Sequence, residues 1–385
     1  MKSVPTANFH RTGLGTPVLF MIFNRPEETA RGLAILREAR PERLYVVSDA
    51  ARAHVEGEAQ LVEGCRDLIE QIDWPCTVKK NYARHNLNCG IRVASGLHWF
   101  FRHEPKGIVV EDDLLPDLSF FSFCEAMLEK YESNKEVMLV SGRNNLGQSE
   151  GRASYFFSRT VNPWGWASWA RAWQHYRFTC NYWTPQTRPL YQEILQDTDQ
   201  ADFHDYNERQ YQGRLLDTWD IQWTYSVFRQ KGLSIVPKVN LVQNTGFHPQ
   251  GTHTHNDFDL RAALPAFHLP APLVHPEKIG YEKSGLDFDR QNFLLEQLAA
   301  LKNPQVLSTI YRMYRANSGA SNAALHERYK DVIPYLYPLA YPQESRDILV
   351  KLKPHLPGNE FLENLLHFFE NQLQQSPKAY ETMKP

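Results

Sequence analysis

Three consecutive carboxylates are the residues of this sequence best suited to chemistry: Glu111, Asp112 and Asp113. They end a short apolar run, 107–110, which is typical of a strand buried on both faces of a parallel sheet. Adjacent carboxylates repel one another unless positive charge lies nearby, and ligands of open α/β sheets bind at the carboxyl ends of strands. A divalent cation that shares phosphate oxygens with a ligand would meet both conditions. The apolar residues 114–116 favour this site over the alternative, a solvated acidic turn.

Polar side chains also end two earlier strands of the predicted sheet. Arg25 follows the apolar run 17–23, and Asp49 ends the run 43–49. In a parallel sheet these side chains and the three carboxylates would face one crevice. A carboxylate accepts hydrogen bonds from a base or a ribose, and a guanidinium donates a fork of them to phosphate. The sequence has neither Gly-x-Gly-x-x-Gly after the first strand nor a phosphate-binding lysine loop, so side chains and metal would have to hold a nucleotide.

Tryptophans mark a third group of candidates. Trp164, Gly165 and Trp166 are predicted to form a tight loop that contacts the face of a sugar, with packing in the core as the alternative. Asp217 and Asp220 are predicted to lie in the first turn of a helix, where capping would be their simplest role.

Asp220 is also a candidate general base. Trp219 precedes it and Trp223 follows it, so its carboxylate would be partly desolvated. Burial raises the pKa of a carboxyl toward the range in which it can accept a proton. A histidine-rich loop then follows at 248–256, which is predicted to carry a metal or phosphate ligand, or else to be an exposed loop without function.

These candidates need a sheet to position them, and the sequence predicts one. Apolar β-branched runs alternate with helical patterns over short connections, which indicates an α/β fold with a mostly parallel, doubly wound sheet flanked by helices. The predicted strands are 17–23, 43–49, 76–80, 107–114, 137–144 and 233–237, and the predicted helices are 26–39, 62–72, 91–102, 119–131 and 216–231.

The character of the chain changes beyond residue 287, where amphipathic helical patterns replace the alternation. We therefore predict one domain at 1–285 and an α-helical C-terminal extension at 286–385, which would serve packing, oligomerisation or partner binding. The helical patterns of the extension are 293–301, 306–314, 322–330, 343–352 and 360–373.

Composition limits the classes of function. A net charge of -2 and a pI near 6.7 give no electrostatic basis for broad nucleic-acid binding, and 12% aromatic residues suit a protein that stacks rings against sugars or bases. The five cysteines form no CxxC pair, which favours free thiols in a reducing compartment. The polar first residues lack a secretory apolar stretch, and no apolar run reaches membrane-spanning length. A soluble cytoplasmic protein is expected, with peripheral contact at the inner face of a membrane as a variant.

Taken in their order along the chain, the polar strand ends, the three carboxylates and the tryptophan-containing segments resemble nucleotide-sugar transferases of the GT-A fold. The sheet of that fold is Rossmann-like. The resemblance runs from about residue 16 to about residue 276 and does not cover the helical extension. More narrowly, the chain is similar to N-acetylglucosaminyltransferase I and to bacterial family-2-like glycosyltransferases. The segments that carry the resemblance are Phe23-Asn24-Arg25-Pro26, Ser48-Asp49, Val109-Val110-Glu111-Asp112-Asp113-Leu114, Trp164-Gly165-Trp166, Trp219-Asp220 and Gly251-Thr252-His253.

The resemblance implies a role for each matching residue. Asp220 would be the catalytic base, and Asp217 is the second candidate because the match needs a one-residue length difference before Gly232. Asp113 would ligate Mn²⁺ or Mg²⁺ bound to the diphosphate, under a loop that closes over the donor. The nucleotide-binding residues would be Arg25, Asp49, Arg92, Glu111 and Asp112, the metal ligands Asp113 and His253, and the residues near the donor or acceptor sugar Trp164, Gly165, Trp166, Trp219 and Thr252.

The expected activity is metal-dependent transfer of a sugar from a nucleoside diphosphate, a UDP-sugar first, to a hydroxyl group. Direct attack by an acceptor that Asp220 deprotonates would invert the anomeric configuration and needs no covalent nucleophile. The acceptor is expected to be a glycan, a lipid-linked saccharide or a protein, and the C-terminal helices are expected to allow a homo-oligomer. A nucleotide-sugar hydrolase and a non-catalytic carbohydrate-binding protein are the alternatives, whereas a nucleotidyltransferase would need a glycine-rich basic loop after the first strand.

Overall fold

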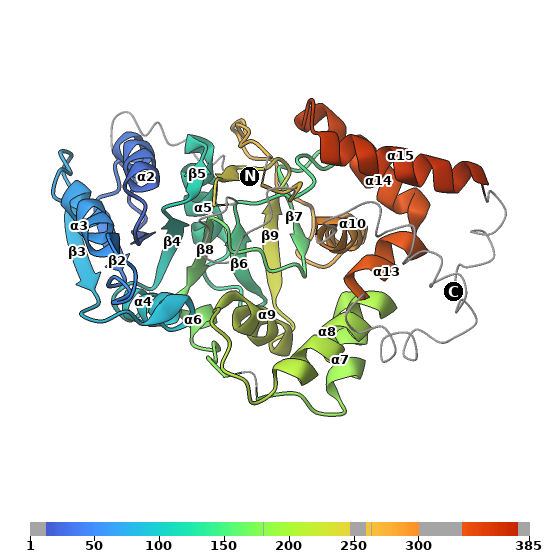
Figure 1. Ribbon diagram of the computed structural model, residues 1–385, viewed down its shortest axis with the longest axis horizontal. Helices are drawn as coiled ribbons and strands as arrows, with labels where there is room; N and C mark the ends of the chain where they lie inside the picture. Colours follow the sequence, from blue (N-terminus) through green and yellow to red (C-terminus); the bar gives the residue numbers. More distant parts are fainter. Residues whose placement is uncertain (1–12, 180, 247–258, 263, 300–332, 376–385) are drawn as a thin grey trace.

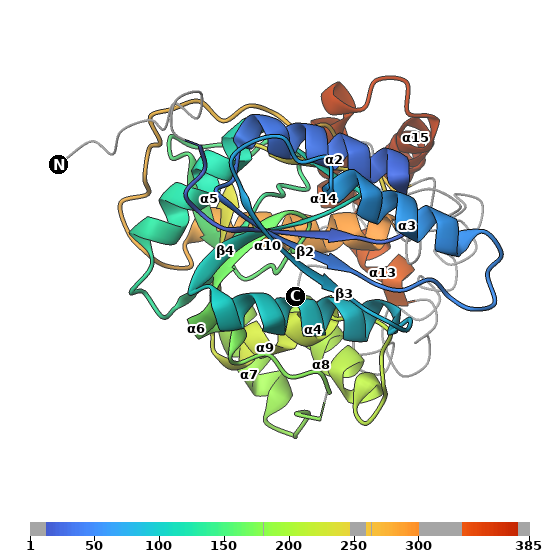
Figure 2. The same ribbon diagram turned by 90° about the vertical axis from the view of Figure 1, so that its left-hand side faces the viewer.

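A computed structural model describes residues 13–179, 181–246, 259–262, 264–299 and 333–375 of the chain. A central sheet of eight strands has helices on both faces (Figures 1 and 2). The order across the sheet is β3-β2-β1-β4-β8-β6-β9-β7. Its strands are β1 (Val18–Ile22), β2 (Arg43–Ser48), β3 (Thr77–Tyr82), β4 (Lys106–Glu111), β6 (Val137–Ser141), β7 (Tyr155–Ser158), β8 (Trp166–Trp169) and β9 (Leu233–Pro237).

Most of the sheet is parallel. Six of the eight strands run in one direction, and only β8 and β7 run against their neighbours. The predicted α/β class with a mostly parallel sheet and C-terminal helices is therefore confirmed. The two antiparallel strands were not predicted, because 155–158 and 166–169 are short and lie among turns. A separate two-stranded sheet joins β5 (Leu114–Pro116) to β10 (Val242–Asn244).

Each central strand is buried on both faces, as its apolar run predicts. In β1, Val18, Phe20 and Ile22 belong to one core cluster, while Leu19 and Met21 belong to another. Successive side chains of a strand point to opposite faces, so both faces require covering helices. In Figure 2 one face carries α2 (Pro26–Ala39), α3 (Glu58–Ile69) and α5 (Leu118–Lys130), and the other carries α4 (Asn88–His103), α6 (Ala170–Trp173) and α9 (Asp220–Arg229).

One of two helix boundaries near the predicted site differs from the prediction. The helix expected at 26–39 does start at Pro26, whose fixed φ and missing N–H suit a first turn that also holds Glu27 and Glu28. The helix expected at 216–231 starts at Asp220 instead, so Asp217 lies in the segment before it. Two helices of the same region were not predicted, α7 (Thr187–Leu195) and α8 (Thr198–Tyr211).

The C-terminal helices pack against the far edge of the sheet (Figure 1). Leu294 and Leu298 share a core cluster with Phe156 of β7 and Val236 of β9. Of the five helical patterns predicted there, 306–314 and 322–330 lie outside the described residues. The helices described are α10 (Lys283–Ala299), α13 (Ile333–Ala340), α14 (Pro342–Leu352), the short 3-10 helix η1 (Lys353–His355) and α15 (Glu360–Gln375).

α10 runs across the predicted domain boundary at residue 285 and is fastened to β7. Asp289 accepts hydrogen bonds from the Ser158 hydroxyl and, at 2.8 Å, from the Arg159 backbone N–H. A Cβ on Gly285 would lie 2.1 Å from the Phe157 carbonyl oxygen, so only glycine allows this close approach. The division of the chain into 1–285 and 286–385 stays a prediction.

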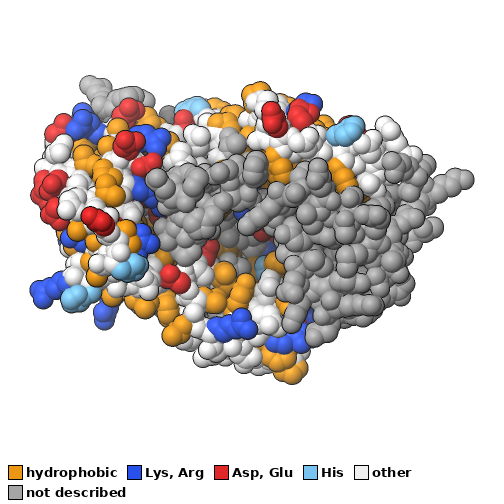
Figure 3. Space-filling view, viewed as in Figure 1, with side chains coloured by type: hydrophobic (Ala, Val, Ile, Leu, Met, Phe, Trp, Pro, Cys, Tyr) orange, Lys and Arg blue, Asp and Glu red, His pale blue; other side chains and the backbone are white. Residues whose placement is uncertain are grey.

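Three further features of the described residues are the length of the helices, the state of the cysteines and the charge of the surface. Within the described ranges, no helix is both long and apolar enough to cross a membrane. The four cysteines in those ranges, Cys65, Cys76, Cys89 and Cys124, are free thiols. Acidic and basic side chains are intermixed over the end of the molecule that carries α2 and α3 (Figure 3).

Candidate active site

A cavity of about 420 Å³ lies at the carboxyl ends of β1, β2 and β4. The first turns of α4 and the segment before α9 form its opposite wall. Six carboxylates and three guanidiniums line it, which makes it rich in charge of both signs with an acidic excess. Most of the predicted site residues meet here: Arg25, Asp49, Arg92, Glu111, Asp112, Asp113, Trp164, Asp217, Trp219 and Asp220.

The three consecutive carboxylates occupy one end of the cavity, which we call the acidic end. Asp112 is buried, and its Oδ2 accepts a hydrogen bond from the Phe23 backbone N–H at 3.0 Å. Arg25 donates from Nη1 to Asp113 Oδ2 at 2.9 Å, and the same nitrogen lies 3.9 Å from Asp112 Oδ1. The parallel register of β1 and β4, which pairs Met21 with Glu111, brings Arg25 to these carboxylates.

Burial and mutual repulsion disfavour full ionisation of the acidic end. Burial, followed by the charges of Asp113, Asp112 and Asp220, raises the pKa of Glu111 to about 8. Burial raises the pKa of Asp112 to about 7, although Arg25 opposes the shift. Arg25 alone does not balance the three carboxylates of the acidic end, so additional positive charge there would be stabilised.

Asp49 and Arg92 lie at the other end of the cavity, which we call the basic end. The buried Asp49 carboxylate accepts hydrogen bonds from the backbone N–H groups of Ala50 at 2.8 Å and Leu87 at 3.0 Å. Burial raises the pKa of Asp49. Arg92 is buried and donates from Nη2 to Asn81 Oδ1 at 3.2 Å, but its Nε has no hydrogen-bond partner among the described residues. That Nε is itself buried, so a ligand would reach it only if the Arg92 side chain shifted.

Asp217 and Asp220 differ in what they contact. Asp217 Oδ1 accepts a hydrogen bond from the Gly90 backbone N–H at 3.1 Å, so Asp217 holds the first turn of α4. Asp220 Oδ1 accepts from the Thr218 hydroxyl and, at 2.9 Å, from the Ile221 backbone N–H. Both residues line the cavity, and the negative charge of Asp220 contributes to the raised pKa of Glu111. The capping role considered for both residues fits Asp217, and Asp220 stays the predicted base.

Only one ring of the Trp164-Gly165-Trp166 segment is placed to contact a ligand. Trp166 is completely buried in β8, where it stacks on Trp219 with centroids 5.7 Å apart, so its predicted contact with a sugar is wrong. The ring is covered on its face of the sheet by Trp173 of α6 and Trp223 of α9. Gly165 has φ +69°, and a Cβ there would lie 2.7 Å from Val242 Cγ2, so its role is to allow the turn.

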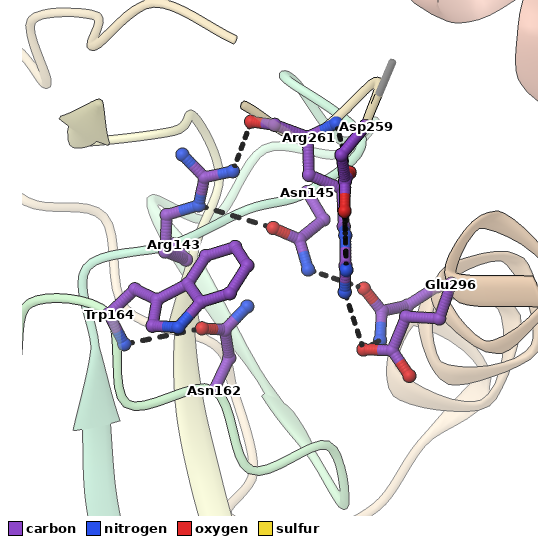
Figure 4. Close-up of polar contacts among 8 residues, drawn as sticks. Arg143, Asn145, Asn162, Trp164, Asp259, Arg261 and Glu296 are labelled. Atoms are coloured by element: carbon purple, nitrogen blue, oxygen red, sulfur yellow. Dashed lines mark hydrogen bonds and ion pairs between the residues drawn. The ribbon is translucent and has the colours of Figure 1, made fainter. Parts of the chain in front are cut away.

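Trp164 lines the cavity and is held by two arginines, Arg143 and Arg261, which lie 5.4 Å and 5.2 Å from its ring centroid (Figure 4). Arg143 is buried, and burial lowers its pKa to about 9. Its guanidinium donates to the Val242 carbonyl at 2.7 Å and to the Arg261 carbonyl at 2.8 Å. Arg143 also donates to Asn145, and Asn145 Nδ2 donates in turn to Asn292 Oδ1 of α10 at 2.9 Å. Position and packing thus make Trp164 a rigid wall of the cavity.

The residues after β10 approach the acidic end from a second direction. Thr245 donates from its backbone N–H to the Asp113 carbonyl at 2.8 Å. A Cβ on Gly246 would lie 2.2 Å from Asp113 Oδ2, so only glycine fits beside that carboxylate. The histidine-rich loop at 248–256, with Thr252 and His253, lies outside the described residues.

The oxygen ligands of the acidic end are the kind that Mn²⁺ and Mg²⁺ prefer. Among the described residues, no three His, Cys, Asp or Glu side chains are grouped so that they alone could hold a metal. The Asp113 carboxylate keeps 20% of its side-chain surface exposed at the cavity. Mg²⁺ is usually bound by one or two carboxylates with phosphate oxygens and water completing the shell. The acidic end fits a divalent cation on those terms.

Several cavity residues were missed by the sequence argument. Arg52 follows Asp49 by three positions, and its pairing with the buried Glu58 fixes the loop after β2. Asn86 donates to Asp49 Oδ2 at 3.2 Å and so orients that carboxylate. Arg52 could have been found from its place just after a strand end, but nothing near Asn86 in the sequence marks it.

Comparisons with known proteins give little guidance. No protein-family model matches the sequence, and no curated protein matches it. Solved structures that resemble part of the chain include UDP-glucose pyrophosphorylase complexed with UDP-glucose. That match has a TM-score of 0.30 and 10% sequence identity, and it covers 59% of this chain and 91% of the other. Similarity at this level assigns neither a family nor an activity, so the function has to be inferred from the cavity itself.

Proposed function

We propose that this protein is a metal-dependent glycosyltransferase that takes a sugar from a nucleoside diphosphate, with a UDP-sugar as the first candidate donor. One observation carries the proposal. A single cavity at the strand ends holds a carboxylate and an arginine, Asp49 and Arg92, at one end and three adjacent carboxylates with Arg25 at the other. A nucleoside diphosphate has the complementary parts, a base with donors and acceptors and a diphosphate that requires cations.

Each end of the cavity would bind a different part of the donor. At the basic end, Asp49 would accept the N3–H of uracil, and the Arg92 guanidinium would donate to a base or ribose oxygen. At the acidic end, Arg25 would donate to the diphosphate, while Asp113 would ligate the cation, with Glu111 and Asp112 toward the ribose. The cation would offset part of the acidic excess of the cavity, and together with Arg25 it would balance the negative charge of the diphosphate.

The chemistry follows from where charge develops. A divalent cation bound to the diphosphate supplies Lewis-acid stabilisation of the negative charge on the leaving phosphate. Asp220, across the cavity, would accept the proton of the acceptor hydroxyl through its carboxylate. Trp164 and Trp219 would confine the sugar by contact with its apolar face. In-line attack from that side inverts the anomeric carbon.

Thermal shift with UDP-, GDP-, CMP- and dTDP-sugars, each with and without Mn²⁺, tests the donor. We expect one donor class to raise the Tm only with Mn²⁺, and Asp113→Ala to lose that shift. Asp220→Asn should keep the shift but lose at least about 100-fold in turnover, as removal of a general base does. Asp217→Asn is the matched control, with a lower Tm but a smaller loss of turnover. A complete absence of nucleotide-dependent shifts would contradict the proposed function.

A further inference from the structure

Arg25 occupies the position from which a cation would act on the acidic end. Its guanidinium donates to Asp113 at 2.9 Å and lies 3.9 Å from Asp112. Only 17% of its side-chain surface is exposed, so the ion pair is shielded from solvent. Its backbone is fixed as well, because the Arg25 carbonyl accepts the Thr29 N–H at 2.9 Å in the first turn of α2.

Arg25 is the arginine of the cavity that serves the acidic end. Arg52 is paired with the buried Glu58, and Arg92 lies at the basic end beside Asn81. A divalent cation on Asp113 would therefore meet a guanidinium already bound to the same carboxylate. Two positive charges cannot share it without repulsion, which is strong between groups shielded from water.

A diphosphate changes this competition. Guanidinium groups bind phosphate through paired hydrogen bonds, and such charge-assisted contacts are among the strongest that arginine makes. When Arg25 turns to the diphosphate, Asp113 Oδ2 loses its present partner and becomes a cation ligand. The diphosphate then provides the remaining oxygen ligands.

We propose that Arg25 couples the binding of the nucleoside diphosphate to that of the divalent cation, because it blocks Asp113 until a diphosphate draws its guanidinium away. This inference rests on the proposed function. It predicts a binding order: the cation alone binds weakly, and cation and nucleotide strengthen each other by the same factor.

Mn²⁺ binding to the full-length protein, followed by the electron spin resonance signal of free Mn²⁺ with and without UDP, tests the coupling. In the wild type we expect UDP to tighten Mn²⁺ binding at least about fivefold, the lower end of typical coupling between sites. Arg25→Gln should bind Mn²⁺ alone at least about fivefold more tightly than the wild type and gain less from UDP. Arg25→Lys, which keeps the charge, should bind Mn²⁺ alone as weakly as the wild type.

Arg31→Gln is the matched control, because it removes the same charge from α2 at an exposed ion pair with Glu28. It should leave Mn²⁺ affinity unchanged. Arg25→Gln leaves carboxylates unpaired and should lower the Tm, so Mn²⁺ alone should raise the Tm of this variant more than that of the wild type.

Two results would contradict the inference, and they can be told apart. If the wild type binds Mn²⁺ with UDP but Arg25→Gln binds Mn²⁺ alone no better than the wild type, the coupling role is wrong and the proposed function stands. If neither protein binds Mn²⁺ or UDP under any condition, the proposed function fails together with the inference.

Discussion

The surroundings of Glu111 disfavour its ionised form. Burial and three neighbouring carboxylates raise its pKa from 4.5 to about 8. Between those two values the folded protein binds more protons than the unfolded chain. Its free energy of unfolding therefore falls as the pH rises from about 4.5 to about 8. Sites that bind a cation commonly carry such a cost to stability.

Glu111→Gln should therefore stabilise the protein at high pH while it weakens donor binding. We expect the free energy of unfolding to rise by at least about 1 kcal/mol at pH 8, since the pKa is raised by more than one unit and each unit corresponds to about 1.4 kcal/mol. At pH 4, where both states of the wild type hold the proton, the difference should vanish. Urea denaturation at the two pH values measures this, and an equal gain at both would show that ionisation of Glu111 is not the cause.

At the scale of elements, the position of Asp220 depends on how closely two segments approach. A Cβ on Gly90 in α4 would lie 2.9 Å from the backbone nitrogen and oxygen of Thr218 and 3.1 Å from the Leu216 carbonyl. The segment 216–218 thus lies directly on the helix, and α9 starts just beyond it. The place of the proposed base is fixed by backbone contact and not by its own side chain.

Gly90→Ala should displace this segment and reduce turnover. We expect a loss of at least about tenfold, because small misplacements of reacting groups are costly. Gly64→Ala is the control in α3, where the new Cβ would lie an ordinary 3.6 Å from Pro26 Cγ. It should keep full turnover and gain up to about 1 kcal/mol of stability, as glycine is a poor helix former. Steady-state kinetics of both variants measures this. Unchanged turnover in Gly90→Ala would show that the position of Asp220 does not depend on this contact.

The features that were predicted correctly from the sequence are those that local residue patterns control. Arg25, Asp49 and Glu111 were recognised because each follows a β-branched run, and the burial of such runs on both faces fixes where they end. Trp166 was misjudged because β8 inserts between β4 and β6, a pairing with partners far away in the chain. Asp217 and Asp220 could not be separated, because the contact that distinguishes them comes from Gly90, 127 positions earlier.

At the scale of the whole molecule, the C-terminal helices share a core with the sheet. Leu294 and Leu298 of α10 pack with residues of β7 and β9, and Asp289 is bonded to the end of β7. Elements that share buried apolar surface usually unfold together.

We therefore expect one cooperative unfolding transition. All nine tryptophans precede residue 285, so their fluorescence reports the sheet region, whereas far-UV circular dichroism also reports the C-terminal helices. The two signals should give the same urea midpoint, and Asp289→Ala should lower both together. Loss of helical signal before the fluorescence change would show that the extension unfolds independently.

The outer edge of β3 has a consequence for how copies of the protein meet. β3 is the last strand on its side of the sheet, so it carries backbone groups that another strand could pair with. Lys79 and Lys80 are exposed there and, as neighbours in a strand, project to opposite faces. Lys79 is bonded to the Tyr45 hydroxyl and Lys80 to Glu70, which holds their stems along the edge. A second copy approaching this edge would have to desolvate two ammonium groups, so the lysines disfavour pairing of β3 with a strand of another copy.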